Sequence, residues 1–321
     1  MNFLFLMDPL NTVVMDKDTS FILMLAASRR GHKVYYLPND GITRKNGKLY
    51  FDVIEVTPQL VKDKPFVEHQ KVALVENEID VVFIRSDPPF DQEYLTNTLL
   101  LDLLPSSIPV INSSSGVRTV NEKLWATQFT SIVPRTLVSS KKDQLLKFLD
   151  EEKDIIIKPT DGHGGKGVFH VKKGDENTNV IIEMMTVNGN RPAIAQQYVP
   201  QAKDGDKRIL LFNGEPLGAV LRVHAQDDHR NNIFAGGKCV ATEITKRDQE
   251  IIEILKPELR KLGLYFVGID IMGEYLIEVN VTSPTCLQEM NQLYKVQLED
   301  KVIDFVEKLI DQSKHKDRIH A

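Results

Sequence analysis

Short apolar runs alternate with longer amphipathic stretches over the first third of the chain. FLFLM (residues 3–7) and HKVYYL (32–37) predict two strands, and the stretch from Thr19 to Gly31 between them has the spacing of a helix. VVFIR (81–85) and IPVIN (108–112) predict further strands, with a helix over 95–104 between them. This order predicts an N-terminal α/β domain over residues 1–120. INSSSG (111–116) then predicts a boundary loop, and a helix containing NEKLWATQF (121–129) follows.

Paired strands dominate the rest of the pattern. DIIIKP (154–159) and GVFHV (167–171) enclose a glycine-rich loop, KRILLFNGEPLGAVLRV (207–223) contains an Asn213-Gly214 turn, and YFVGIDIMGEYLIEVNV (265–281) predicts another hairpin. AIAQQYV (193–199) predicts one more strand, and helices are expected over 141–152, from Thr245 to Gly263, and over 302–310. We therefore expect an antiparallel α+β region made of two parts, residues 121–203 and 204–313. A frayed polar tail over 314–321 should follow.

Composition narrows the classes of protein. The 321 residues carry 42% hydrophobic and 26% charged residues, and the longest apolar runs are too short to span a membrane. Met1 leads into FLFLMDP without a basic region or a cleavage site, so no secretory signal is expected. Two cysteines without metal-ligand spacing suit a reducing compartment, which favours the cytoplasm. A net charge of −5 with both signs interspersed favours small-molecule partners over nucleic acid or membrane.

The loop in KPTDGHGGKGVFHV (158–171) has the G-x-G-x-x-G spacing at Gly162, Gly164 and Gly167. A dinucleotide site needs a helix directly after these glycines, and a strand is predicted there instead. A Walker A loop fails because valine follows Gly167, and a protein kinase fails because no H-R-D or D-F-G follows. A hairpin lid over nucleotide phosphates remains, beside the alternative of a surface hairpin that binds nothing.

Two lysines and one polar strand face favour the nucleotide alternative. Lys158 ends the strand that enters the loop, and with Lys123 it could hold phosphates from two sides, although each alone could be a surface lysine. Glu278 and Asn280 share one strand face, and Asp270 joins them if it lies opposite Glu278. That register predicts an odd-length turn around Gly273-Glu274, with Met272 and Leu276 on the polar face and Ile277 on the apolar one. Oxygen ligands of this kind suit Mg²⁺ that also binds phosphates, whereas the alternative is a solvated polar face.

Several short motifs follow one another along the chain: MDP (7–9), RSDPPFD (85–91), NEKLW (121–125), IIIKPTDGHGG (155–165), QQYVPQAKDGDKR (196–208), AGG (235–237) and EVNVTSPTC (278–286). Together they resemble bacterial-type glutathione synthetase, a member of the ATP-grasp superfamily. RSDPPFD and EVNVTSPTC are specific to that family, and the resemblance covers residues 1 to about 310. It implies an ATP-grasp fold preceded by an N-terminal α/β (pre-ATP-grasp) domain that binds substrate. It also implies a ligase that joins γ-glutamylcysteine to glycine through an acyl phosphate, releasing ADP and phosphate.

The resemblance also implies roles for individual residues. Lys123 and Lys158 would hold the ATP phosphates, Gly164 and Gly165 would belong to the lid, Gln197, Tyr198 and Val199 would form the adenine hinge, and Asp206 would approach the ribose. Mg²⁺, or Mn²⁺ in its place, would be bound by Asp270, Glu278 and Asn280. Arg208 and Arg222 would be catalytic, facing the transferred phosphate. Arg85, Ser283, Pro284 and Thr285 would bind the dipeptide, and a homo-oligomer is implied by the family alone.

Some features leave alternatives. Without the resemblance, Arg222 could form a surface salt bridge, and Cys286 after Pro284 and Thr285 is expected to be a small buried hydrophobe outside the chemistry. QDDHRNNIF (226–234) departs from a glycine-rich lid, so we expect a different closure, with Arg230 placed to touch phosphate. The rival functions are another ATP-grasp ligase, acting on D-alanine or a terminal glutamate, and a non-catalytic ATP-binding regulatory protein.

Overall fold

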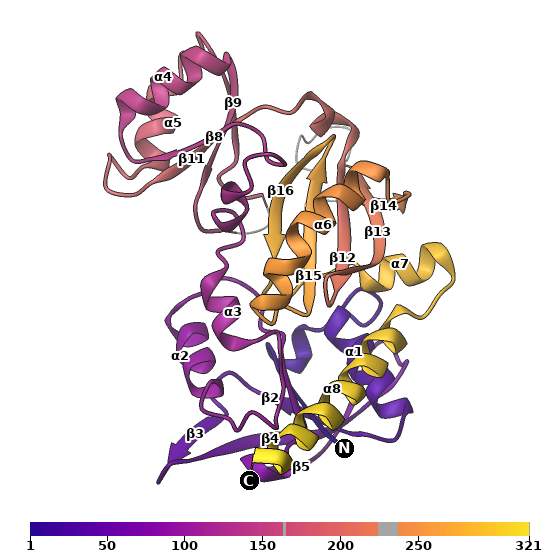
Figure 1. Cartoon of the computed structure of the whole chain (residues 1–321). Helices are drawn as coiled ribbons and strands as arrows, with labels where there is room; N and C mark the ends of the chain where they lie inside the picture. Colours follow the sequence, from indigo (N-terminus) through magenta and orange to yellow (C-terminus); the bar gives the residue numbers. More distant parts are fainter. Residues whose placement is uncertain (163–164, 224–236, 321) are drawn as a thin grey trace.

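A computed structural model of the chain describes residues 1–162, 165–223 and 237–320, with side chains up to residue 315. Within these ranges the strands form three sheets, stacked along the length of the molecule (Figure 1). We call them the N-terminal sheet (β1–β7), the central sheet (β8–β11) and the C-terminal sheet (β12–β16). No described helix is long and apolar enough to cross a bilayer.

The N-terminal sheet combines parallel and antiparallel strands. Strands β1, β2, β6 and β7 pair in parallel, whereas β3, β4 and β5 form an antiparallel extension that begins at β2. The elements are β1 Asn2–Leu6, α1 Thr19–Arg29, β2 Lys33–Leu37, β3 Ile42–Lys45, β4 Lys48–Pro58, β5 Phe66–Val75, β6 Val81–Ile84, α2 Gln92–Leu101, β7 Val110–Ile111 and α3 Ser114–Thr119.

Helix α1 is capped by Asp18, whose side chain accepts a hydrogen bond from the Phe21 amide at 2.8 Å. The predicted βαβ unit is confirmed by the parallel pairing of β1 with β2. Strands β3 to β5 were not predicted, although β4 alternates between buried and more exposed positions.

The central sheet has the strand order β10-β9-β11-β8, and its neighbours pair antiparallel. Its elements are β8 Thr136–Ser139, α4 Lys142–Glu152, β9 Asp154–Pro159, β10 Phe169–Lys172, α5 Thr178–Met185 and β11 Ala193–Gln197. Leu145, Leu149 and Ile182 from the two helices pack against Ile155, Ile157 and Val171 of the sheet. The glycine-rich segment therefore joins two antiparallel strands, as predicted.

The C-terminal sheet has the order β14-β13-β12-β15-β16. Its elements, with the helices around it, are β12 Asp206–Phe212, β13 Glu215–Val223, β14 Lys238–Ala241, α6 Lys246–Lys261, β15 Phe266–Met272, β16 Tyr275–Asn280, α7 Leu287–Tyr294 and α8 Leu298–His320. Helix α6 lies against the sheet (Figure 1). Its Ile251, Leu255 and Leu259 are buried in the core on the apolar face of the sheet. Thr245 caps α6, and Gly263 follows the helix end with a φ of +64°, as the sequence predicted.

Three local predictions were wrong. Residues 121–124 form a turn, because the Asn121 side chain accepts hydrogen bonds from the Lys123 and Leu124 amides at 3.1 and 2.9 Å, and only a 3₁₀ helix over Trp125–Gln128 follows. The expected loop at 111–116 is instead partly taken up by α3. The expected polar tail over 314–321 is helical as far as His320, within α8.

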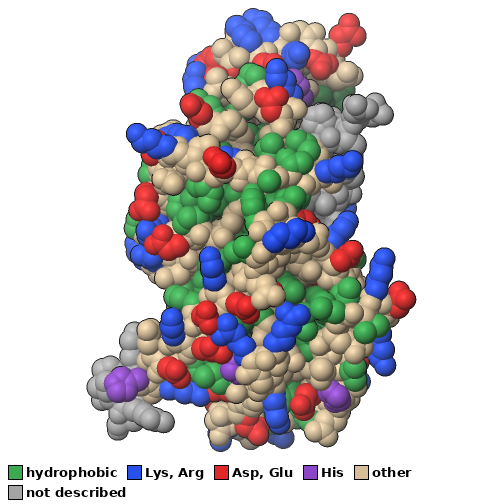
Figure 2. Space-filling model, turned by 90° about the vertical axis from the view of Figure 1, so that its right-hand side faces the viewer, with side chains coloured by type: hydrophobic (Ala, Val, Ile, Leu, Met, Phe, Trp, Pro, Cys, Tyr) green, Lys and Arg blue, Asp and Glu red, His purple; other side chains and the backbone are tan. Residues whose placement is uncertain are grey.

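Helix α8 returns to the N-terminal sheet and lies beside α1 (Figure 1). Val302, Val306 and Ile310 are fully buried in the core that contains α1. Arg30 donates hydrogen bonds to Asp304 at 2.5 Å and Glu307 at 3.1 Å. Positive and negative side chains are interspersed over the face shown in Figure 2, without a large patch of one sign.

Candidate functional site

Six of the predicted site residues lie on one face of the C-terminal sheet. The pairing places Asp206 opposite Arg222, Arg208 opposite Asp270, and Asp270 opposite Glu278. Asn280 lies two residues beyond Glu278 and therefore shares its face. The strand alternation thus brings together three acidic, two basic and one amide side chain: Asp206, Asp270, Glu278, Arg208, Arg222 and Asn280.

The register of Asp270 and Glu278 was predicted correctly, but the expected odd-length turn is wrong. The hairpin closes with two residues, because Met272 pairs with Tyr275, and a β-bulge shifts the register between Asp270 and Ile271. The bulge also reverses the expected faces of two side chains: Leu276 is fully buried in the core with Ile271, whereas Ile277 is only half-buried. The extra residue that brings Asp270 opposite Glu278 therefore lies in β16 and not in the turn.

Two arginines hold Asp270 in this face. Arg208 donates two hydrogen bonds to the Asp270 carboxylate, one of 2.8 Å, and Arg222 lies 2.9 Å from its Oδ2. Burial opposes ionisation of Asp270, but the two guanidiniums lower its pKa below the ordinary value. Asp270 is therefore an anion although it is buried.

Asp206 has a different balance of the same forces. Its carboxylate pairs with Arg222, which donates from Nε at 3.1 Å and also from Nη2. Burial is the largest effect and raises the pKa of Asp206 to about 6, against the opposing attraction of Arg222. Asp206, predicted to approach a ribose, is therefore buried in an ion pair.

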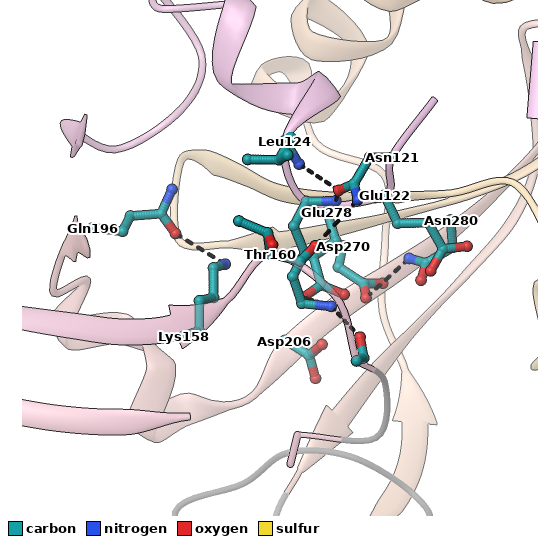
Figure 3. A network of polar contacts seen from close by, with 12 residues as sticks. Asn121, Glu122, Leu124, Lys158, Thr160, Gln196, Asp206, Asp270, Glu278 and Asn280 are labelled. Carbon is teal, nitrogen blue, oxygen red and sulfur yellow. Dashed lines mark hydrogen bonds and ion pairs between the residues drawn. The ribbon is translucent and has the colours of Figure 1, made fainter. Parts of the chain in front are cut away.

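The two predicted phosphate lysines approach this face from other segments, and Figure 3 shows Lys158. Lys158, at the end of β9, donates to Gln196 Oε1 at 3.3 Å. Lys123 donates to the Gly162 carbonyl at 2.5 Å and lies 3.5 Å from Glu278 Oε1. Burial lowers the pKa of the Lys158 ammonium, and the nearby Lys123 lowers it further, whereas Glu278 and Asp270 raise it. An added anion beside these lysines would therefore favour the charged form of Lys158.

The glycine loop and the predicted adenine hinge flank Lys158. Gly165 and Gly167 both have a φ of +72°, a backbone conformation that is strained for residues with a Cβ. Gly164 lies outside the described residues, as does the segment 226–234 with Arg230. Gln197 ends β11, Val199 is buried, and the Tyr198 ring stacks on His170 of β10 with 4.0 Å between centroids.

The residues predicted to bind the dipeptide join the N-terminal and C-terminal sheets. Arg85 follows β6 and donates from Nη2 to the Pro284 carbonyl at 3.1 Å and from Nε to Ser20 at 2.9 Å. Burial lowers the pKa of this guanidinium, and its Nη1 has no hydrogen-bond partner among the described residues. Ser283 and Thr285 are half-buried on either side of Pro284. Pro284 lies close to the backbone of Gly268 in β15. A glycine permits this contact, because a Cβ at position 268 would lie only 3.0 Å from Pro284 Cβ.

The structure adds polar residues that the sequence did not single out. Gln196 holds Lys158, and its position two residues before Tyr198 could have indicated it. Glu122, inside the NEKLW motif, accepts hydrogen bonds from Val281 and Thr282. Asn112 donates to the carbonyls of Phe266 and Val281 at 2.7 and 2.8 Å, and no local pattern distinguished it.

Among the described residues, no group of three or more histidine, cysteine, aspartate or glutamate side chains could hold a metal ion. The predicted metal set contains two carboxylates and one amide, and the amide nitrogen of Asn280 donates to Asp270 Oδ2 at 3.3 Å (Figure 3). These donors are the oxygen-rich kind that suits Mg²⁺ when nucleotide phosphates supply further ligands.

Comparisons with known families divide the chain into two matching parts. Residues 1–118 match the prokaryotic glutathione synthetase N-terminal domain, and residues 122–295 match the prokaryotic glutathione synthetase ATP-grasp domain. A glutathione synthetase of Synechococcus elongatus is 42% identical over 322 residues, covering 97% of this chain and all of the relative. One from Pseudomonas aeruginosa is 39% identical over 312 residues, covering 94% of this chain and 95% of the relative.

Solved structures of lower identity share the fold. The crystal structure of the D-cycloserine synthetase DcsG matches with a TM-score of 0.65 and 15% identity, covering 98% of this chain and all of that one. The ATP-grasp ligase PsnB, complexed with a precursor variant, Mg and ADP, matches with a TM-score of 0.61 and 15% identity, covering 96% of this chain and 98% of that one.

Proposed function

The chain belongs to the prokaryotic glutathione synthetase family and is an ATP-dependent ligase that forms glutathione, and from this premise we propose how its residues carry the reaction. ATP transfers its γ-phosphoryl group to the cysteinyl carboxylate of γ-glutamylcysteine. The amine of glycine attacks the resulting acyl phosphate, phosphate leaves, and the amide bond remains. The acyl phosphate is needed because a carboxylate is a poor electrophile, whereas phosphate is a good leaving group.

Lys123 and Lys158 hold the phosphates in this proposal. Their ammonium groups come from a turn and from β9, so they can contact the nucleotide from two sides, and both are largely buried from water. Gly164 and Gly165 belong to the loop that approaches the phosphates, and Gln197, Tyr198 and Val199 border the adenine. Asp206 lies near the ribose in this proposal, and the ion pair with its carboxylate orients the Arg222 guanidinium.

Arg208 and Arg222 stabilise the negative charge of the transferred phosphoryl group. They suit this role because Asp270 and Asp206 fix both guanidiniums before any ligand binds, so little reorganisation is needed during the reaction. Arg85 and the segment Ser283, Pro284 and Thr285 bind the dipeptide. The Nη1 of Arg85 supports this, because it is a buried donor that finds no acceptor in the described part of the chain.

Asp270, Glu278 and Asn280 would hold Mg²⁺, or Mn²⁺ in its place. Bound there, the ion would supply charge neutralisation for the nucleotide phosphates. Asp270 would share its carboxylate between the ion and the arginines, whereas Glu278 is half-buried and has Lys123 as its ion-pair partner. The observation that carries the proposal is this convergence of Asp270 and Glu278, opposite each other on neighbouring strands, with Lys123.

The test of the reaction is ADP release with γ-glutamylcysteine and glycine, each omitted in turn. We expect turnover only when both are present, and turnover that requires D-alanine instead would overturn the substrate assignment. Glu278→Gln should reduce turnover and raise the magnesium concentration needed for half-maximal rate, because one anionic ligand is lost. Glu274→Gln removes the same charge from the exposed turn of the same hairpin and should leave both unchanged. An unaltered magnesium dependence in Glu278→Gln would show the metal assignment to be wrong.

We also propose that the protein works in the cytoplasm and forms a homo-oligomer. The two free thiols, Cys239 and Cys286, support a reducing compartment. The molar mass in solution, measured by light scattering, tests the second part, and the mass of a single 36.4 kDa chain would contradict it.

A further inference from the structure

Three consecutive residues of the turn after α3 contact three different parts of the site. Asn121 donates to the Thr160 carbonyl at 3.1 Å, just beyond Lys158 and β9. Lys123 contacts Gly162 and Glu278. Glu122 lies between them and contacts the end of β16 and the segment that follows it. The turn is therefore a junction between the central and C-terminal sheets (Figure 3).

Glu122 makes the contacts that matter most for the geometry of this junction. Its Oε1 accepts hydrogen bonds from the Val281 amide at 3.1 Å, the Thr282 amide at 3.4 Å and the Thr282 hydroxyl at 2.9 Å. Its backbone carbonyl accepts from the Val279 amide at 2.9 Å. One residue thus accepts hydrogen bonds from three backbone amides, those of Val279, Val281 and Thr282.

These amides need such a partner because β16 lies at the edge of the sheet. Among the strands that the structure describes, it pairs only with β15, so none of them lies beside the amides on its outer side. Beyond Asn280 the chain leaves the sheet, and Val281 is fully buried. A buried amide without an acceptor is costly, so loss of the carboxylate would favour movement of this segment. The Val281 carbonyl is held from the opposite direction by Asn112.

The segment that Glu122 holds connects the proposed metal site to the proposed dipeptide site. Val281 and Thr282 lie between Asn280, which belongs to the proposed metal site, and Ser283 to Thr285, which belong to the proposed dipeptide site. We propose that Glu122 is a positioning residue, which sets the distance between the dipeptide carboxylate and the phosphoryl group that Lys123 helps to hold. The inference rests on the proposed site assignments. It requires no contact between Glu122 and any ligand.

The first experiment compares Glu122→Ala with Glu122→Gln. The alanine variant removes the acceptor, so we expect kcat to fall about 10- to 100-fold, the effect of a small misplacement of reacting groups, and the KM for γ-glutamylcysteine to rise. The KM for ATP should stay within about twofold, because Lys158 and the residues around Tyr198 are untouched. The glutamine variant keeps a carbonyl oxygen at the same position and should retain most of the activity.

Glu76→Ala is the matched control. Glu76 also accepts a hydrogen bond from a backbone amide, that of Leu49 at 2.8 Å, but it lies at the N-terminal sheet, away from the site. It should lower the melting temperature without changing kcat or either KM. Thr282→Val removes only the hydroxyl donor and should lower kcat to a smaller extent. Combined with Glu122→Ala it should add little, because both changes remove the same contact.

The outcomes separate this inference from the site proposal. A folded Glu122→Ala with unchanged kcat and dipeptide KM would overturn the positioning role, even while Glu278→Gln remains impaired. Equal impairment of the alanine and glutamine variants would also overturn it, because the charge and not the acceptor would then matter. If Glu122→Ala fails to fold, full activity in Thr282→Val would serve to reject the role. An active Glu278→Gln with wild-type magnesium dependence would instead refute the site proposal itself.

Discussion

Burial and a few neighbouring charges set the pKa of each buried carboxyl in this site. Asp206 and Asp270 lie on the same face and contact the same arginine, yet burial raises the pKa of Asp206 to about 6, whereas two guanidiniums lower the pKa of Asp270. Asp206 was readable from the QQYVPQAKDGDKR motif, and Asp270 from the predicted hairpin YFVGIDIMGEYLIEVNV. Their partners were not, because a sequence does not state which strands become neighbours.

Asp206 predicts a pH dependence of stability. Because its pKa in the folded protein lies above the ordinary value of 3.8, the folded protein holds a proton that the unfolded chain releases between about pH 4 and 6. The stability from this proton is fully present below about pH 4 and is lost as the pH rises through 6, by at most about 3 kcal/mol. Asp270 does not contribute in this window, since its lowered pKa acts only below about pH 4.

The measurement is denaturant unfolding of the wild type and Asp206→Asn at pH 4.5 and 7.0. The wild type should lose more stability between these two values than the variant, because asparagine has no proton to exchange. Equal losses in the two proteins would show that Asp206 titrates normally.

Strands and turns place these side chains, and the sequence predicted most of the strands but not every local conformation. Hydrophobic alternation predicted the strands of the central and C-terminal sheets except β8 and β14, and it placed Asp270 opposite Glu278. It failed for Leu276 and Ile277, because a bulge exchanges the faces of a strand without any change in composition. It failed at 121–124 because the Asn121 side chain competes for the amides that a helix would use.

The glycine loop allows a prediction at the scale of one hairpin. Gly165→Val should raise the KM for ATP about 10-fold or more, since a branched side chain would strain a backbone with a φ of +72° and obstruct the approach to phosphate. Gly174→Val is the control, because Gly174 has a φ of +93° in the turn at the other end of β10, with nothing within 4 Å of an added Cβ. Both variants should lose stability, but only the first should lose affinity for ATP. Identical ATP kinetics in both would argue against a phosphate-binding lid.

In the whole molecule, a helix from the end of the chain packs against the first unit. The division at residues 120, 203 and 313 stays a prediction, although each proposed unit contains one sheet. Helix α8, assigned by position in the sequence to the third unit, packs on α1 of the first. Nothing local in VIDFVEKLI predicts its partner, because an apolar helix face is complementary to many others.

A core substitution in α8 tests this packing. Ile310→Ala should lower the free energy of unfolding by about 2–5 kcal/mol, because Ile310 is fully buried against the core that contains α1. Lys308→Ala, on the exposed side of the same helix, should change it by less than about 0.5 kcal/mol. The KM for ATP should be unaltered in both, as measured by ADP release. An Ile310→Ala protein as stable as the wild type would contradict the packing.

The return of α8 also has a consequence for the order of events during synthesis. Residues 298–320 leave the ribosome long after Thr19–Arg29 of α1, yet they cover apolar side chains of that helix. The nascent first unit must therefore wait with that surface uncovered, or shielded by a chaperone, while the ATP-grasp region is translated.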